Sequence, residues 1–255
     1  MIELKSPGEI DAMRVAGKVV ATALRAVREG AAVGTSLREL DEIAASVLAD
    51  AGAGSPFLHY HPGFAPSPFP AVLCTSVNDA VVHGVPTNYR LRDGDLLSID
   101  FGAEVDGWHG DAATSFVVGT ADPGDLDLIA TTERALAAGI EAARPGNRLG
   151  DIGHAIGGVG RAAGYGMLAD HGGHGIGRAM HEAPSVPNEG RPGRGLRLRP
   201  GMVIAIEPML IAGGGDSYRV AADGWTLHTV DGSRAAHAEH TVAITADGPR
   251  ILTTE

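Results

Sequence analysis

Several residue types are scarce in this 255-residue sequence, and each shortage excludes a class of protein. The one cysteine, Cys74, rules out an internal disulfide and fits a reducing compartment. There is no run of about 18 apolar residues and no apolar signal segment at the start, so we expect a soluble cytoplasmic protein with no membrane partner. Basic residues number 20 against 31 acidic ones, and the net charge of −11 argues against binding to DNA.

Glycine, in contrast, is abundant, with 37 residues, and it marks the histidine-rich segment DHGGHGIGRAMHEAP. His171, His174 and His181 lie in this segment at spacings that superficially resemble a helical zinc motif. Each glycine in a helix interior costs about 1 kcal/mol relative to alanine, so a strand edge or loop is predicted instead. Taken alone, the segment leaves three roles open for its histidines: metal ligands, acid–base catalysts or ordinary polar groups of a loop.

Helix signals occur in two pairs along the chain. A capping sequence at Ser6 predicts a helix that ends near Gly30, and a second at Ser36 predicts a helix that ends near Gly52. A further pair is predicted at about 125–143 and 151–163, and strand-rich sequence follows each pair.

A short repeat supports the same division of the chain. The segments LRDGDLLSID (91–100) and LRPGMVIAIE (198–207) share four residue types in register, and each follows a helix pair. Matching segments at matching places predict two structurally related parts. The predicted single domain covers residues 1–255, with halves at about 1–120 and 121–255.

Each repeated segment ends in an acid, Asp100 in the first and Glu207 in the second. A carboxylate that ends an apolar strand is costly to remove from water unless a cation, several donors or solvent compensates. Asp111 and Glu239 adjoin two further strand-like runs. If the halves pack about a local two-fold axis, the four acids converge, and proton uptake or metal ions must relieve their repulsion. One added imidazole would favour Mn, Fe, Co or Zn over Ca and Mg.

Seven further motifs follow one another in a characteristic order: CTSVND, VVHGVP, DGDLLSIDFG, GWHGDAATSF, GHGIGRAMHEAP, LRPGMVIAIEPM and AEHT. In this order and spacing the chain resembles the type I methionine aminopeptidases over nearly its whole length. The resemblance implies an α+β pita-bread fold, with two pseudo-twofold related halves and an antiparallel sheet covered by helices. It also implies metal-dependent hydrolysis that removes the initiator methionine from nascent polypeptides and peptides with a small second residue.

The resemblance assigns a role to each candidate site residue. Glu207 would accept a proton from the attacking water and donate one to the leaving nitrogen, His181 would contact the carbonyl oxygen, and His83 the peptide nitrogen. Two neighbouring divalent ions can share and activate one water. The ligands that the resemblance implies for two such ions, Co, Mn, Fe or Zn, are Asp100, Asp111, His174, Glu207 and Glu239, with Asp111 and Glu239 bridging both.

The pocket for the methionine side chain is assigned in the same way. Its wall would include Cys74, Phe69 and Trp225, with Tyr60 or Phe64 as a further aromatic. The chain departs from the family pattern nearby: Ala71 and Val72 replace a Lys-Ser pair, Met180 replaces a phenylalanine, and Ala238 replaces an aromatic residue. These changes alter the shape of the pocket and leave the ligand set intact.

Other interpretations remain open. A proline-directed aminopeptidase of the same fold is the enzymatic alternative, and a pita-bread protein that binds without catalysis is the non-enzymatic one. His171, His109 and His240 are expected to be polar groups of loops or of the surroundings of the site. We expect a monomer. The group Arg191, Arg194, Arg197 and Arg199 is expected to be a solvated loop, with a ribosome contact as the alternative.

Overall fold

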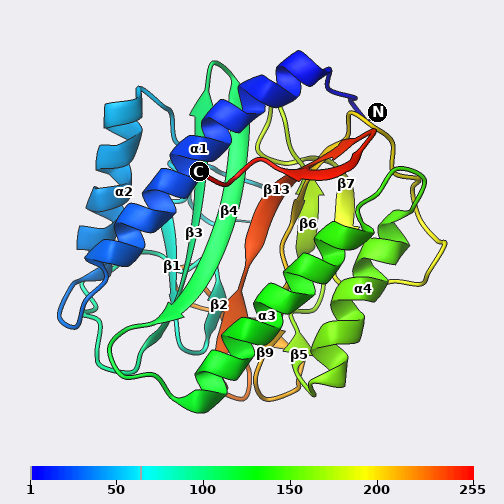
Figure 1. Cartoon of the computed structure of the whole chain (residues 1–255). Helices are drawn as coiled ribbons and strands as arrows, with labels where there is room; N and C mark the ends of the chain where they lie inside the picture. Colours follow the sequence, from blue (N-terminus) through cyan, green and yellow to red (C-terminus); the bar gives the residue numbers. More distant parts are fainter. Residues whose placement is uncertain (1, 64) are drawn as a thin grey trace.

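The computed structural model describes residues 2–63 and 65–255, so Phe64 lies outside the described residues. Four long helices cover one face of a large antiparallel sheet (Figure 1), which confirms the predicted α+β fold. The sheet has eight strands in the order β1-β3-β4-β13-β8-β6-β7, and β14 pairs with β13. Among the described residues, no helix combines the length and the apolar character needed to cross a bilayer.

Helices α1 (Pro7–Gly30) and α2 (Leu37–Ala51) begin and end at the predicted signals. In the first, the Ser6 hydroxyl accepts from the backbone N–H of Glu9, and the Glu9 carboxylate accepts from the N–H of Ser6 at 2.7 Å. The second ends at Gly52, whose φ of +62° is a left-handed conformation that glycine adopts without strain.

Helices α3 (Pro123–Ala142) and α4 (Leu149–Ala162) each begin two residues before the predicted starts at 125 and 151. The Asp122 carboxylate accepts from the N–H of Gly124 and caps α3 ahead of the proline. Asp151 is the third residue of α4, where its carboxylate accepts from the N–H of Arg148 at 2.7 Å. The acid taken as the start of this helix therefore lies inside its first turn.

The strands form one large sheet and two small ones. The large sheet contains β1 (Leu73–Val77), β3 (Leu96–Val105), β4 (Trp108–Val117), β6 (Gly172–Gly175), β7 (Glu182–Pro187), β8 (Val203–Ile206), β13 (Glu239–Thr245) and β14 (Gly248–Ile251). One small sheet joins β10 (Tyr218–Val220), β11 (Leu227–Thr229) and β2 (Ala80–Val82). The other joins β12 (Ala235–His237), β9 (Met209–Ile211) and β5 (Gly166–Met167).

The β3–β4 hairpin corrects the predicted position of two acids. Ten residues of each strand pair in register around the turn at Asp106 and Gly107, both of which have positive φ, as two-residue hairpin turns prefer. Asp100 and Asp111 consequently lie inside long strands instead of at strand ends. The alternation of polar and apolar residues continues through both acids, because one face of the hairpin is polar.

The two faces of the sheet carry different side chains. Ile99 and Phe101 are fully buried against residues of α1 and α2, so Asp100 between them faces the other side. In the same way Ile206 and Val242 pack with α3 and α4. The helices thus bury one face, and the acids gather on the face that the helices leave uncovered.

Candidate metal centre and active site

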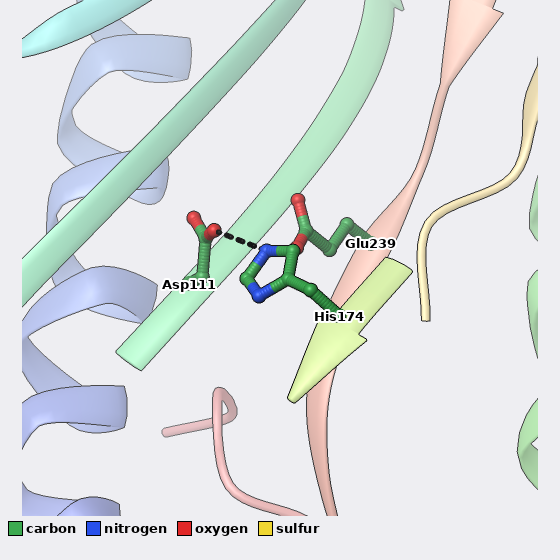
Figure 2. A group of neighbouring side chains, drawn as sticks. All are labelled: Asp111, His174 and Glu239. Atoms are coloured by element: carbon green, nitrogen blue, oxygen red, sulfur yellow. Dashed lines mark ion pairs between the residues drawn. The ribbon is translucent and has the colours of Figure 1, made fainter. Parts of the chain in front are cut away.

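Four carboxylates and one imidazole meet at a cavity of about 310 Å³. Figure 2 shows three of them, with Asp111 on β4, His174 on β6 and Glu239 on β13 pointing toward one another. Asp100 comes from β3, and Glu207 directly follows β8. The residues that line the cavity are Phe57, Tyr60, Phe69, Cys74, His83, Asp100, Asp111, His174, Met180, His181, Glu207, Trp225 and Glu239. Every predicted site residue within the described chain is therefore present.

Hydroxyl groups fix the strands that carry these acids. The Asp111 N–H donates to the Thr241 hydroxyl at 3.0 Å, and that hydroxyl donates back to the Asp111 carbonyl at 2.8 Å. Ser115 bonds both the N–H and the carbonyl of His237 in the same way, at 2.9 and 2.8 Å. These side-chain bonds extend the short β4–β13 ladder on both sides of Glu239 and hold its backbone in register.

Two glycines allow β6 to carry His174 into the site. A Cβ on Gly173 would lie 2.0 Å from the carbonyl oxygen of Ala205, and one on Gly175 would lie 2.2 Å from that of Ala183. The backbone of β7 and β8 therefore approaches β6 too closely for a side chain at either glycine. The His174 Nδ1 donates to the Gly175 carbonyl at 2.9 Å. Because a carbonyl only accepts, the neutral ring directs its Nε2 lone pair to the acids.

The acids of the cluster carry more negative charge than the protein alone compensates. Burial, followed by repulsion from the neighbouring acids, raises the pKa of Asp100, Glu207 and Glu239 well above ordinary values, and burial raises the pKa of Asp111 to about 8. None of the described residues that line the cavity is a lysine or an arginine. Within the described chain, Asp100 Oδ1, Asp111 Oδ1 and Glu239 Oε1 are buried and without a hydrogen-bond partner.

Divalent cations fit this arrangement. The His174 Nε2 lies 3.6 Å from both Asp111 Oδ2 and Glu207 Oε1, too far for a hydrogen bond and suitable for ligands around one ion. The donor set, carboxylate oxygens with an imidazole nitrogen, is the kind that binds first-row transition metals and zinc. A buried group of acids without basic partners is otherwise unfavourable unless the acids take up protons.

Two other histidines border the cavity without joining the acid cluster. His83 has a φ of +58°, and burial together with His171 and His181 lowers its pKa to about 4. His181 lies at the mouth, where its ring stacks on Tyr60 with centroids 5.2 Å apart. Burial, then His174 and His109, lower the pKa of His181 to about 4 as well. Both imidazoles are therefore neutral at pH 7.

The rest of the cavity wall consists of aromatic rings and sulfur-containing side chains. Phe69 packs edge-on against Trp225 and Phe57, with centroids 5.2 and 6.4 Å away. Cys74 is buried, and burial raises the pKa of its thiol well above the ordinary value, so it stays protonated. Met180, expected from the sequence to alter the shape of the pocket, lines the wall, and so does Phe57, which the sequence did not indicate. Phe57 lies outside all the motifs on which the family resemblance rests, and nothing in its local sequence distinguishes it.

His237 is the polar residue that sequence reasoning missed. It is 2% exposed at the end of β12, and its Nε2 has no hydrogen-bond partner among the described residues. The sequence could have indicated His237 through its position two residues before Glu239. In extended chain, residues two apart have their side chains on the same face. His240, on the opposite face, instead has its Nδ1 2.8 Å from the Thr253 hydroxyl.

The remaining candidates, two histidines and four arginines, contact backbone or solvent, as expected of ordinary polar residues. The ring nitrogens Nδ1 of His171 and His109 donate to the backbone carbonyls of Ala169 and Gly177, at 2.8 and 3.1 Å. His171 also packs edge-on against Tyr218, with ring centroids 5.0 Å apart. The arginines at 191, 194, 197 and 199 are exposed in the segment between β7 and β8.

Comparison with known proteins gives a consistent result. Residues 11–246 match metallopeptidase family M24. The chain is 54% identical to methionine aminopeptidase 1 of Mycobacterium tuberculosis, with 99% of this chain and 95% of that protein covered. It is 47% identical to the methionine aminopeptidase of Clostridium perfringens, with 99% of each covered.

Comparison with solved structures gives the same result as the sequence comparison. The methionine aminopeptidase of Thermotoga maritima superimposes with a TM-score of 0.95 at 41% identity, covering 100% of both chains. The prolidase of Pyrococcus furiosus gives 0.78 at 24% identity over 99% of this chain and 65% of that one, a likeness of fold alone. The chain belongs to metallopeptidase family M24 and, within that family, to the methionine aminopeptidases.

Proposed function

We propose that this protein hydrolyses the first peptide bond of chains that begin with methionine and have a small second residue. The observation that carries the proposal is the joining of two features in one cavity, a cluster of four acids with an imidazole and a narrow apolar wall. The cluster supplies hydrolytic chemistry, and the wall suits a flexible thioether side chain. The relatives of known name support the same activity.

We assign five residues to the metal centre: Asp100, Asp111, His174, Glu207 and Glu239. Two divalent ions held by these residues, Asp111 and Glu239 among them, would balance the four carboxylates. The ligand types suit Mn, Fe, Co or Zn. When bound, such a pair of ions polarises the peptide carbonyl and lowers the pKa of a shared water.

Side chains of the protein would then transfer protons and orient the substrate. Glu207 would accept the proton of the attacking water on its carboxylate and pass it to the leaving nitrogen. His181, at the mouth, would donate an N–H to the carbonyl oxygen as that oxygen gains charge, and His83 would contact the peptide nitrogen. Because both imidazoles are neutral, they do not repel the free amino group of the substrate.

The wall accounts for the choice of methionine. Phe57, Phe69 and Trp225 form a rigid aromatic surface, and Cys74 and Met180 add polarisable sulfur. An unbranched thioether fills such a space with little loss of contact, whereas a β-branched or charged side chain would not. Tyr60, stacked on His181 at the rim, would limit the size of the second residue.

Peptide cleavage tests the proposal directly. The protein reconstituted with Mn²⁺ or Co²⁺ should release methionine from Met-Ala-Ser much faster than from Met-Lys-Ser. A Xaa-Pro peptide tests the proline-directed alternative, and preferential cleavage of that peptide would contradict our assignment. Failure to bind any divalent ion, together with no turnover, would indicate the non-catalytic alternative.

We further propose a single catalytic unit of two related halves that acts as a monomer in the cytoplasm, where new chains carry their first methionine. The order of elements supports two halves, since each helix pair precedes strands that supply acids to the centre. The exposed arginines between β7 and β8 could contact ribosomal RNA through its phosphates. Reversing two of those charges without loss of ribosome association would dismiss that contact.

A further inference from the structure

His237 has no role in the proposed reaction, yet its side chain lies at the centre of the site. The Nε2 atom is 3.7 Å from Glu207 Oε2 and 3.8 Å from Glu239 Oε2. The residue is 2% exposed, and Nε2 has no hydrogen-bond partner within the described chain. A buried polar atom without a partner is unfavourable, so an imidazole in this position calls for a partner close by.

The main chain of His237 is anchored to the β3–β4 hairpin. Its N–H donates to the Ser115 hydroxyl at 2.9 Å, and its carbonyl accepts from that hydroxyl at 2.8 Å. The hydroxyls of Ser115 and Ser98 lie 2.7 Å apart, which ties the residue to both strands of the β3–β4 hairpin. The His237 backbone is therefore tied to the strands that carry Asp100 and Asp111, which fixes the point from which its side chain reaches the acids.

The two oxygens of Glu207 face two different imidazoles. Oε1 lies 3.6 Å from the Nε2 of His174, and Oε2 lies 3.7 Å from the Nε2 of His237. The His174 Nε2 presents a lone pair, since its Nδ1 donates to a carbonyl. When Glu207 is ionised, as a metal ligand must be, a second lone pair directed at Oε2 would repel that oxygen, whereas an N–H at the same place would attract it. A shift of about 0.5 Å at the end of either side chain brings this pair within hydrogen-bond distance.

We propose that His237 is a positioning residue, which donates its Nε2–H to Glu207 Oε2 and so keeps Oε1 of the same carboxylate turned toward His174. This inference rests on the proposed function, because Glu207 is the group assigned to proton transfer. A donor on Oε2 would leave Oε1 free for the metal centre. Ligands of metals are commonly oriented by such partners in proteins.

The test compares three variants of the full chain. His237→Gln keeps an N–H donor of similar reach and removes the imidazole, and His237→Leu removes the donor while keeping bulk. His154→Gln, at an exposed position of α4, controls for the loss of any histidine. For each variant we would measure kcat and KM on Met-Ala-Ser, the Mn²⁺ affinity by calorimetry, and the melting temperature of the metal-free protein. In wild-type protein loaded with Zn²⁺, long-range ¹H–¹⁵N NMR shows whether the His237 Nε2 carries a proton.

We expect that kcat falls in one variant and recovers in the other. His237→Leu should lower kcat by about 10- to 100-fold with a much smaller change in KM, His237→Gln should recover most of that loss, and Nε2 should carry a proton. A Gln variant as poor as the Leu variant, with Nε2 lacking a proton, would show that His237 binds the metal directly and overturn the proposal. Unchanged kcat in both variants would show that His237 only packs against its neighbours, and would also overturn the proposal.

These outcomes separate the inference from the proposed function. If the wild-type protein cleaves no methionyl peptide, the assigned reaction fails, but the NMR measurement still decides whether Nε2 bears a proton or binds a metal. If His237→Leu does not fold, the Gln variant and the wild-type NMR measurement still decide the question.

Discussion

Removal of the divalent ions should make the stability of this protein fall as the pH rises from 6.5 to 8. In the metal-free native state the acids of the centre hold protons, because burial and mutual repulsion raise their pKa values, that of Asp111 to about 8. In the unfolded chain the same acids ionise near pH 4. A group with a raised native pKa stabilises the fold fully below its unfolded pKa, and this contribution is lost as the pH rises through the native value.

The size of the effect follows from the number of protons. Each proton that the native state holds and the unfolded state has lost changes the unfolding free energy by about 1.4 kcal/mol per pH unit. Asp111 alone should therefore remove about 1.4 kcal/mol between pH 6.5 and 7.5, and the other raised acids act with the same sign.

The buried histidines set the lower limit of this pH window. Burial lowers the pKa of His83 to about 4 and that of His237 to about 3, so their contribution has the opposite sign and is lost as the pH falls below 6.5. Above pH 6.5 these histidines are mostly neutral in both the native and the unfolded state, so the acids set the slope between pH 6.5 and 8.

Urea unfolding in the presence of a chelator measures this dependence at pH 6.5, 7.0, 7.5 and 8.0. Asp111→Asn retains the shape of the side chain without its titration, and its slope should be shallower by about 1.4 kcal/mol per pH unit. Adding Mn²⁺ at about 1,000 times its dissociation constant should restore about 4 kcal/mol to the wild-type protein. A metal-free wild-type protein with equal unfolding free energies at pH 6.5 and 7.5, or an Asn variant with the wild-type slope, would refute the reasoning.

Three further substitutions test other parts of the structure. Gly173→Ala forces a Cβ against the Ala205 carbonyl oxygen at 2.0 Å, and should lower the unfolding free energy by about 1–3 kcal/mol and weaken Mn²⁺ binding in calorimetry. Lys5→Met breaks the 2.6 Å ion pair with Glu182, and urea unfolding should show a loss of about 3 kcal/mol, whereas an unchanged midpoint would contradict a buried pair. His181→Ala should reduce kcat about 100- to 1,000-fold with the bound metal content unchanged, and loss of metal would instead make it a ligand.

Local sequence signals predicted the helices well because caps act over a few residues. Ser6 and Ser36 each bond a backbone N–H three residues away, so both starts could be predicted from the sequence. The α3 and α4 starts were placed two residues late because an acid of the first turn was taken as the first residue. Motif order likewise identified the acids that gather in the cavity.

Long-range pairing could not be predicted in the same way. Asp100 was placed at a strand end, because nothing in its own segment shows that β3 continues through it to form ten pairs with β4. His237 was missed because its importance depends on contacts far away in the sequence: Ser115, 122 residues away, bonds its backbone, and Glu207 lies 3.7 Å from its Nε2. Phe57 enters the wall through the fold of a segment without regular structure.

The central position of β13 has a consequence for the order in which the protein can fold. This strand lies between β4 and β8, but it is made about 120 residues after β4 ends. At about 5 to 20 residues per second, β4 emerges from the ribosome and waits roughly 6 to 24 s before its partner exists. During that time its edge is open to pairing with other chains, and inward charges are one protection against such pairing. Asp111, with its neighbour Asp100, places charge on that hairpin, so the acids assigned to the metal centre would also keep the unfinished sheet from aggregating.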